Sequence, residues 1–152
     1  MVYVQSVMKA GKNIVNSHNE WDTLEEVIVG KGLPEKLPAL DSNLIDDKNT
    51  PELHISKWHI HEHNEDIENY VDLLKSHGIT VRRPKTPDKI NTIKTPDWKS
   101  SNHPALNVRD LTMIVGNKII ETPPSLRFRY FENDFMKHIF LEYFKSGAEW
   151  IT

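Results

Sequence analysis

The sequence predicts an α/β fold that contains two loose copies of one strand–helix–strand unit. Two segments carry the repeat, because LLKSHGITV (73–81) and EYFKSGAEWI (142–151) each combine a helix end, small polar residues, a glycine and a strand. A strand that ends in Val-Gly precedes each copy, at Val29-Gly30 and at Val115-Gly116. Units that cannot bury their faces alone need further copies, so the two units predict part of a larger closed assembly.

The composition is typical of a globular protein. The 152 residues are 27% charged and 38% hydrophobic, with a formal net charge of −3, and a chain of this length can bury a sizeable core. The densest basic cluster, residues 82–85, is too short for a nucleic-acid-binding stripe. No apolar run approaches the ~20 residues that span a bilayer, and the N-terminus lacks signal-peptide features. We therefore expect a cytoplasmic protein with no nucleic-acid or membrane partner.

The first half of the chain predicts one strand–helix–strand unit. After a flexible N-terminus (1–14), residues 24–30 are rich in β-branched side chains and predict a strand. Residues 31–56 hold three prolines and no stable period, which predicts a long loop. Apolar residues at helical spacing predict a helix over 57–77, capped by Ser56, and a strand over 79–82 follows.

The second half predicts a similar unit after another loop. Residues 84–104 contain several prolines and predict this second long loop. Gly116-Asn117 separates two apolar runs, 111–115 and 118–121, and is typical of a two-residue hairpin turn. Apolar residues at i+4 spacing predict a helix over 131–145. Residues 148–152 then begin a strand that reaches the last residue, an unusual place for a domain to finish.

Arg109 and Asp110 stand directly before an apolar strand, where burying either charge is costly without a partner. If strand geometry begins there, the two side chains point to opposite faces and one can be turned into a site. An aspartate at this place could hold a guanidinium group in a bidentate, charge-assisted hydrogen bond. The pattern alone favours a salt bridge at the strand end. The pattern likewise indicates that Arg127 and Arg129 are solvated charges at the start of a helix.

Histidines form the most conspicuous polar cluster, between residues 54 and 63. On a helix, His59 and His63 share a face and Asp66 lies one turn further, so a metal set of two histidines and a carboxylate is feasible. The polar face of an amphipathic helix explains the same residues, and the spacing is not that of the HExxH motif. We predict no metal and no other cofactor. Cysteine is absent, which excludes a disulfide or a thiol nucleophile in this chain.

Four stretches of the chain carry a family resemblance, in order and at near-constant spacing. They are VNSHNEWDTLEEVIVG (15–30), GITVRRP with KTPD (78–84 and 94–97), RD with the strands that follow (109–123), and RFRYFE with YF to W (127–132 and 143–150). Together they resemble the glycine (L-arginine:glycine) amidinotransferases and their inosamine-phosphate relatives. The resemblance covers about residues 15–152 and only the N-terminal part of that family, whose members are considerably longer.

The resemblance implies a pentein fold, in which five ββαβ-type units surround a pseudo-fivefold axis with a polar channel. Residues 1–152 would be the N-terminal portion of such a domain, a partial propeller of about two units. In this family a cysteine thiolate attacks the guanidino carbon of L-arginine, and an amine acceptor such as glycine later takes the amidino group. Asp110 falls on the guanidinium-binding aspartate of the family, with Arg109 and Arg127 as site neighbours. The catalytic cysteine and histidine match no residue of this chain.

The resemblance implies a transferase whose isolated chain does not turn over. Two explanations stay open: a truncated or split amidinotransferase, and a non-catalytic arginine-binding or regulatory module. A homo-oligomer or a missing C-terminal portion would complete the fold. The family usually has Met-Pro or Cys-Pro before Arg-Asp, where this chain has Asn107-Val108, and it also differs over residues 122–126. These departures flank the expected site and leave the acceptor amine open.

Overall fold

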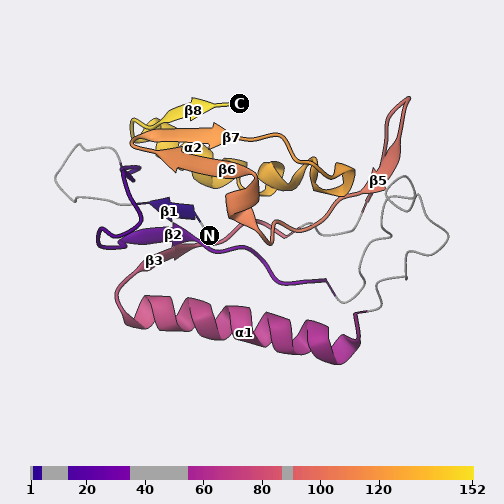
Figure 1. Ribbon diagram of the computed structural model, residues 1–152, viewed down its shortest axis with the longest axis horizontal. Helices are drawn as coiled ribbons and strands as arrows, with labels where there is room; N and C mark the ends of the chain where they lie inside the picture. Colours follow the sequence, from indigo (N-terminus) through magenta and orange to yellow (C-terminus); the bar gives the residue numbers. More distant parts are fainter. Residues whose placement is uncertain (1, 5–13, 35–54, 87–90) are drawn as a thin grey trace.

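A computed structural model describes residues 2–4, 14–34, 55–86 and 91–152 of the protein (Figure 1). In this described part, the chain forms two three-stranded sheets, one two-stranded sheet and two α-helices. Each three-stranded sheet belongs to one unit of the repeat. The two-stranded sheet projects from the molecule in the segment that connects the units (Figure 1).

The first unit is a sheet of order β1-β2-β3 with a helix in its crossover. Strand β1 (Val2–Val4) pairs antiparallel with β2 (Glu26–Ile28), and β2 pairs parallel with β3 (Thr80–Arg82). Helix α1 (Lys57–Ser76) lies between β2 and β3 in the chain and along one side of this sheet (Figure 1). A parallel pair of strands needs such a crossover connection.

The second unit repeats the same order of elements. Strand β6 (Thr112–Val115) pairs antiparallel with β7 (Lys118–Glu121), and β7 pairs parallel with β8 (Glu149–Ile151) through helix α2 (Lys137–Lys145). Both units are therefore ββαβ units. The predicted α/β class is confirmed, and the repeat in the sequence corresponds to this repeated topology.

Helix α1 follows the pattern that predicted it. Ile60, Val71 and Leu74 are its buried residues, and the Oγ of Ser56 accepts a hydrogen bond of 3.3 Å from the backbone N–H of His59. An N-cap of this kind satisfies a backbone donor that the first turn leaves unpaired. Gly78 follows the helix with a φ of +78°, a left-handed conformation that favours glycine.

The β6–β7 hairpin is also confirmed, with Gly116 in its turn at a φ of +58°. The turn is joined to the N-terminal half of the chain by two backbone hydrogen bonds. Ser17 N–H donates to the Gly116 carbonyl at 3.0 Å, and Gly116 N–H donates to the Ser17 carbonyl at 2.7 Å. This bridge places the segment 17–20 alongside the second unit.

The segment 84–104, predicted as a loop, contains a hairpin of β4 (Thr92–Lys94) and β5 (Lys99–Ser101). Its turn is closed by Thr95, whose N–H donates to the Trp98 carbonyl at 2.9 Å and whose Oγ1 accepts from the Trp98 N–H at 3.1 Å. Thr-Pro-Asp-Trp is thus a turn sequence with local hydrogen bonds. The prolines indicated a loop, but they did not reveal the short strands on both sides of this turn.

The helix predicted over 131–145 begins only at Lys137, because two short 3-10 helices, η2 (Arg127–Arg129) and η3 (Glu132–Phe135), come before it. The side chain of Asn133 explains the difference. Its Nδ2 donates to the Leu111 carbonyl at 3.0 Å and its Oδ1 accepts from Thr112 Oγ1 at 3.2 Å. These buried contacts hold η3 against the start of β6 and keep it out of the α-helix.

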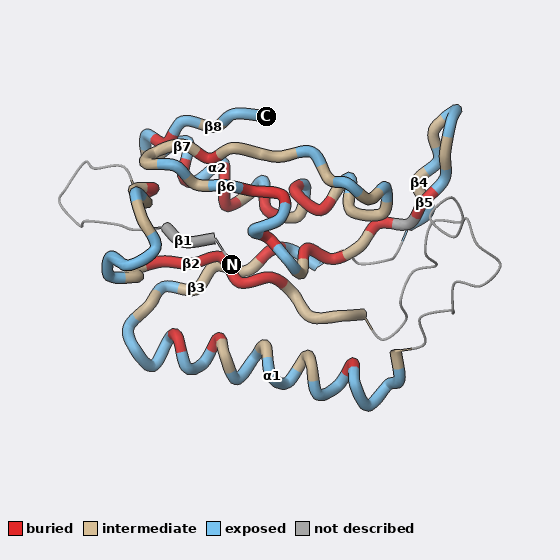
Figure 2. Tube along the Cα trace, in the orientation of Figure 1, coloured by how far each residue is buried: buried red, intermediate tan, exposed pale blue. Residues whose placement is uncertain are grey.

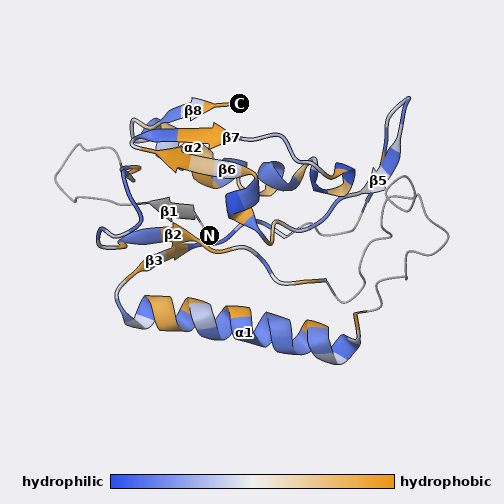
Figure 3. Cartoon of the chain, viewed as in Figure 1, coloured by the Kyte–Doolittle hydropathy of each residue, from blue (hydrophilic) through white to orange (hydrophobic). Residues whose placement is uncertain are grey.

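The core consists of two clusters of apolar side chains, the larger of which also contains Ile28 of β2 from the first unit. The larger lies between α2 and the β6-β7-β8 sheet and includes Phe140 and Tyr143, which are fully buried. The smaller lies between α1 and β2 around Val27 and Val71. Figure 2 shows buried residues along β2 and on the side of α1 toward β2 and β3, and Figure 3 shows apolar residues on β6 and β7.

Parts of three predicted segments lie outside the described residues. Of the predicted flexible N-terminus (1–14), residue 1 and residues 5–13 are outside. Of the predicted loop 31–56, residues 35–54 are outside, and His54 is among them. Residues 87–90 of the loop 84–104 are also outside. In the ranges that are described, no helix is both long and apolar enough to cross a membrane.

Candidate functional site

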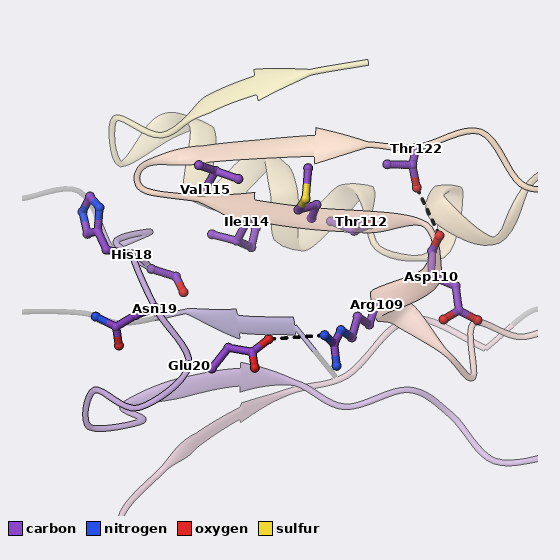
Figure 4. A pocket seen from close by; sticks show the side chains of 11 residues that line it. His18, Asn19, Glu20, Arg109, Asp110, Thr112, Ile114, Val115 and Thr122 are labelled. Atoms are coloured by element: carbon purple, nitrogen blue, oxygen red, sulfur yellow. Dashed lines mark hydrogen bonds and ion pairs between the residues drawn. The ribbon is translucent and has the colours of Figure 1, made fainter.

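A cavity of about 450 Å³ lies between the N-terminal segment 17–20 and the β6 strand (Figure 4). Its walls are formed by that segment, by Arg109 and Asp110, by residues 112–115 and by Thr122. Asp110 precedes β6 and His18 touches Gly116 beyond its other end, so these two residues mark opposite ends of the cavity. Carboxylate, guanidinium, imidazole and apolar side chains therefore surround one space.

Arg109 and Asp110 do not lie in a strand, so the predicted alternation of their side chains across a sheet is wrong. They belong to a 3-10 helix, η1 (Val108–Asp110), in which Asp110 N–H donates to the Asn107 carbonyl at 3.1 Å. Val108 and Leu111 on either side are 1% and 3% exposed and anchor this turn in the core. The tight turn brings both charged side chains out at the cavity. Because neither charge is buried, neither incurs the free-energy cost of burial before an apolar strand.

Asp110 is held by an arginine from another element. Arg129 of η2 donates Nη1 to Asp110 Oδ2 at 2.7 Å and Nη2 to the Asn107 carbonyl at 3.1 Å. The Asp110 side chain is 50% exposed, whereas that of Arg129 is 15% exposed. The hydroxyl of Thr122 donates to the backbone carbonyl of Asp110 at 3.1 Å (Figure 4). Both the backbone and the carboxylate of Asp110 are therefore fixed.

Glu132 is the second partner of Arg129 and is itself buried. The pair is bidentate, because Nε reaches Oε1 and Nη2 reaches Oε2, each at 2.9 Å. Burial raises the pKa of Glu132, while the hydrogen bond from Arg129 opposes that rise. Burial alone would lower the pKa of Arg129, but its hydrogen bonds to Glu132 and then Asp110 outweigh burial and raise it. Arg129 thus stays charged between two carboxylates.

Arg109 pairs with Glu20 across the side of the cavity. Its Nη2 lies 3.2 Å from Glu20 Oε1, and the two side chains are 70% and 73% exposed (Figure 4). An ion pair this exposed contributes at most about 1 kcal/mol to stability. It links the segment 17–20 to η1 and borders the cavity without closing it.

The other residues singled out in the sequence have different surroundings. Arg127 is exposed on η2 and is not part of the cavity wall. Arg129, interpreted as a solvated charge, is instead the partner of Asp110 with only 15% of its side chain exposed, so that interpretation is wrong. The Arg-x-x-Glu spacing of Arg129 and Glu132 was the one signal in the sequence for their pair.

Two of the histidines on α1 contact neighbouring side chains. His59 is engaged with the capping Ser56, at 2.7 Å between Nδ1 and Oγ, and His61 lies 3.8 Å from Glu65. In the described residues, no group of three or more histidine, aspartate or glutamate side chains is arranged to hold a metal ion.

Fold and site together define an α/β protein of ββαβ units with a polar cavity beside an Arg-Asp turn. No family model matches the chain. Glycine amidinotransferase, mitochondrial, of Danio rerio is 37% identical over 149 residues, which cover 91% of this chain and 35% of the relative. Inosamine-phosphate amidinotransferase 1 of Streptomyces griseus is 36% identical over 149 residues and covers 92% of this chain and 43% of the relative.

Solved structures agree with these sequence matches. The inosamine-phosphate amidinotransferase of Streptomyces griseus superposes with a TM-score of 0.79 at 36% identity, over 92% of this chain and 43% of the other. An amidinotransferase from the saxitoxin biosynthetic pathway of Microseira wollei superposes with a TM-score of 0.71 at 35% identity, over 90% and 40%. The chain belongs to the family of the glycine and inosamine-phosphate amidinotransferases. It spans about 35–43% of the length of the curated relatives it matches.

Proposed function

We propose that this chain supplies the guanidinium-binding part of an amidinotransferase that moves the amidino group of L-arginine to an amine acceptor such as glycine. The observation that carries the proposal is the half-exposed carboxylate of Asp110 at the wall of the cavity, with Oδ2 fixed by Arg129 at 2.7 Å. A carboxylate held in one orientation can accept charge-assisted hydrogen bonds from a guanidinium group. Arg109 and Arg127 are proposed neighbours of this site.

The reacting part of the proposed site is not in this sequence. Transfer through a covalent intermediate requires a nucleophile that attacks the guanidino carbon, and the chain contains no cysteine. We propose that ββαβ units outside residues 1–152 supply the cysteine and histidine and complete a five-unit pentein ring. They would come from a C-terminal portion of the same protein or from an assembly of chains. The isolated chain is then expected to release no ornithine from arginine and glycine, and measurable turnover would refute the argument.

Binding of arginine tests the role of Asp110. Titration of the protein with L-arginine, followed by calorimetry or NMR, should give weaker binding for Asp110→Asn by about 1.5–3 kcal/mol, the range for hydrogen bonds to a charged group. L-Citrulline, which is uncharged at the same position, should bind more weakly than arginine. Asp72→Asn is a matched control, because Asp72 lies on α1 and pairs with Lys75. Equal affinity of the Asp110→Asn variant and the wild-type protein would show that Asp110 is only structural.

A non-catalytic arginine-binding or regulatory module is the second candidate, because it would use the same Asp110 carboxylate and needs no nucleophile. The two candidates differ when the missing residues are supplied. The chain fused to a segment with a cysteine and a histidine should release ornithine if it is part of an enzyme. Arginine binding without ornithine from the fusion would favour the module. A cytoplasmic location is also proposed, and cell fractionation can separate it from the mitochondrial location that the name of the Danio rerio relative gives.

A further inference from the structure

Asp110 already has a cationic partner, which raises the question of how it could attract a second cation. Arg129 is that partner, and a simple one-to-one ion pair would cancel the charge of the carboxylate before any ligand arrived. The arrangement around Arg129 is not one-to-one. The guanidinium lies between Asp110 and Glu132, so its charge is shared by two carboxylates.

We propose that Arg129 is a positioning residue that orients Asp110 for a guanidinium ligand, and that Glu132 cancels the charge of Arg129 so that Asp110 keeps its own. This inference rests on the proposed function, because it takes Asp110 as the residue that meets the ligand. It assigns separate tasks to the two partners. Arg129 sets the orientation of the Asp110 carboxylate, and Glu132 neutralises the charge of Arg129.

The hydrogen-bond geometry supports this division. Glu132 takes the bidentate contact, with two bonds of 2.9 Å from Nε and Nη2, whereas Asp110 receives a single bond of 2.7 Å from Nη1. Bidentate pairing of arginine with a carboxylate is the stronger and more specific form. Glu132 is 4% exposed and Asp110 is 50% exposed, so Glu132 pairs with Arg129 away from solvent while the Asp110 carboxylate faces solvent and cavity.

The charges of the cluster leave one negative charge at the cavity. Arg129 contributes one positive charge, and Asp110 and Glu132 contribute two negative charges, so the cluster has a net charge of −1. His103 adds no positive charge at pH 7, because burial and the nearby Arg129 lower its pKa to about 4. Within the described residues, the hydrogen bond to the Asp110 carboxylate comes from Arg129 and reaches Oδ2. Oδ1 is left for a ligand.

Glu132→Gln tests the electrical balance without changing a residue of the cavity wall. Glutamine keeps an acceptor for Arg129 but removes one negative charge, so the net charge of the cluster becomes zero. We expect the affinity for L-arginine to fall by about tenfold. Without the negative charge of Glu132, the positive charge of Arg129 is cancelled by Asp110 instead, and the carboxylate attracts the ligand guanidinium less strongly. Glu68→Gln is the matched control, because Glu68 pairs with Arg83 at 2.7 Å on the α1 side of the molecule. It should bind arginine as the wild-type protein does.

The double variant R129Q/E132Q separates geometry from charge. It removes one positive and one negative charge, so the net charge stays at −1 while the bond that orients Asp110 is lost. We expect arginine to bind about tenfold more weakly, and R129K, which restores a cationic donor, to recover part of the loss. The double variant leaves no buried unpaired charge, so it should fold even if Glu132→Gln alone does not. Wild-type affinity in both E132Q and the double variant would overturn the proposal.

The ¹³Cγ resonance of Asp110 in ligand-free protein distinguishes failure of this inference from failure of the proposed function. We expect the resonance to move in R129Q and to stay in place in the Glu68→Gln control. If it moves but the wild-type protein binds no arginine, the proposed function fails and the orientation of Asp110 by Arg129 is supported. If the wild-type protein binds arginine but the resonance does not move, Asp110 keeps its proposed function and the positioning role of Arg129 is overturned.

Discussion

Tyr143 donates a hydrogen bond of 2.6 Å from its hydroxyl to Glu26 Oε1 and thereby joins the two ββαβ units. Tyr143 lies on α2 of the second unit and Glu26 on β2 of the first, and both residues are buried. Arg82 of β3 donates Nε to the same oxygen at 3.0 Å and Nη1 to Glu142 at 3.1 Å. Burial raises the pKa of Tyr143, and the hydrogen bond to Glu26 adds to the rise, so the phenol stays a donor. A polar contact thus crosses between two apolar cores.

Tyr143→Phe should lower the free energy of unfolding by about 1–3 kcal/mol, because it removes a donor from a buried carboxylate. Urea denaturation followed by circular dichroism measures the change. Tyr130→Phe is the control, since Tyr130 is 57% exposed and an exposed substitution is expected to stay within about 0.5 kcal/mol of the wild-type protein. Equal stabilities of the two variants would mean that the bond between the units contributes nothing.

Gly30→Ala should be the most damaging of the small substitutions. A Cβ at Gly30 would lie 1.8 Å from the Leu106 carbonyl oxygen and 2.8 Å from the Ala105 carbonyl oxygen, and both are backbone atoms. The two segments of the chain approach this closely because the Lys31 N–H donates to the Ala105 carbonyl at 2.8 Å. We expect a loss of roughly 3 kcal/mol or more in unfolding free energy, at the upper end of overpacking effects.

Gly78→Ala provides the contrast, because a Cβ at Gly78 would meet nothing within 4 Å. Only its φ of +78° opposes alanine, so the expected cost is about 1 kcal/mol, that of a left-handed conformation. Chemical denaturation of both variants separates a steric clash from a backbone preference. A smaller loss for Gly30→Ala than for Gly78→Ala would contradict the close approach of the Leu106 backbone to Gly30.

Ser56→Ala should destabilise α1 by about 1 kcal/mol, the usual value for an N-cap. The hydroxyl of Ser56 accepts a hydrogen bond from the His59 N–H and is the side-chain cap of the first turn of α1. Ser76→Ala is the control at the other end, where the hydroxyl donates to the Leu73 carbonyl and the residue is exposed. Thermal unfolding should show a lower midpoint for Ser56→Ala alone, and an equal shift in both variants would contradict a specific cap.

The elements that the sequence predicted best are those fixed by local chemistry. Helix α1 has a cap, an apolar face and a glycine stop within one stretch, and the β6–β7 turn has Gly116-Asn117. Element η3 was missed because its geometry is set by Asn133, which bonds to Leu111 and Thr112 more than 20 residues away. Long-range side-chain contacts of this kind override local periodicity.

The candidate site shows the same division. Asp110 was found through its place in an Arg-Asp motif, but its partner Arg129 was interpreted as a solvated charge. The two residues are 19 positions apart and meet only because the folded chain brings η2 against η1. The strand geometry predicted for Arg109-Asp110 failed for a related reason. Val108 and Leu111 are both buried on one side of a tight turn, whereas a strand would point these two side chains to opposite faces of the sheet.

His103 should make the protein less stable as the pH falls. Its ring packs on Phe128 with centroids 4.6 Å apart, and its Nε2 is buried without a hydrogen-bond partner among the described residues. Burial, with a smaller contribution from the charge of Arg129, lowers its pKa from the usual 6.5 to about 4. Between pH 6.5 and 4 the unfolded chain therefore binds a proton that the folded protein does not bind, and stability falls over this window. Above pH 6.5 His103 is neutral in both states, so its contribution is constant.

His103→Phe keeps the aromatic contact and removes the titration, so it is the variant that tests this dependence. Each unit of pKa difference corresponds to about 1.4 kcal/mol, and partial exposure reduces the effect, so we expect a loss of about 1–3 kcal/mol in the wild-type protein from pH 6.5 to 4. Aspartates and glutamates titrate in the same range, so the quantity to compare is the difference between the two proteins in urea denaturation at each pH. The unfolding free energy of the wild-type protein minus that of the variant should fall from pH 6.5 to 4 if His103 is responsible. Parallel stability curves, or an NMR titration that places the pKa of His103 at 6.5 or higher, would contradict the burial of its ring as the cause.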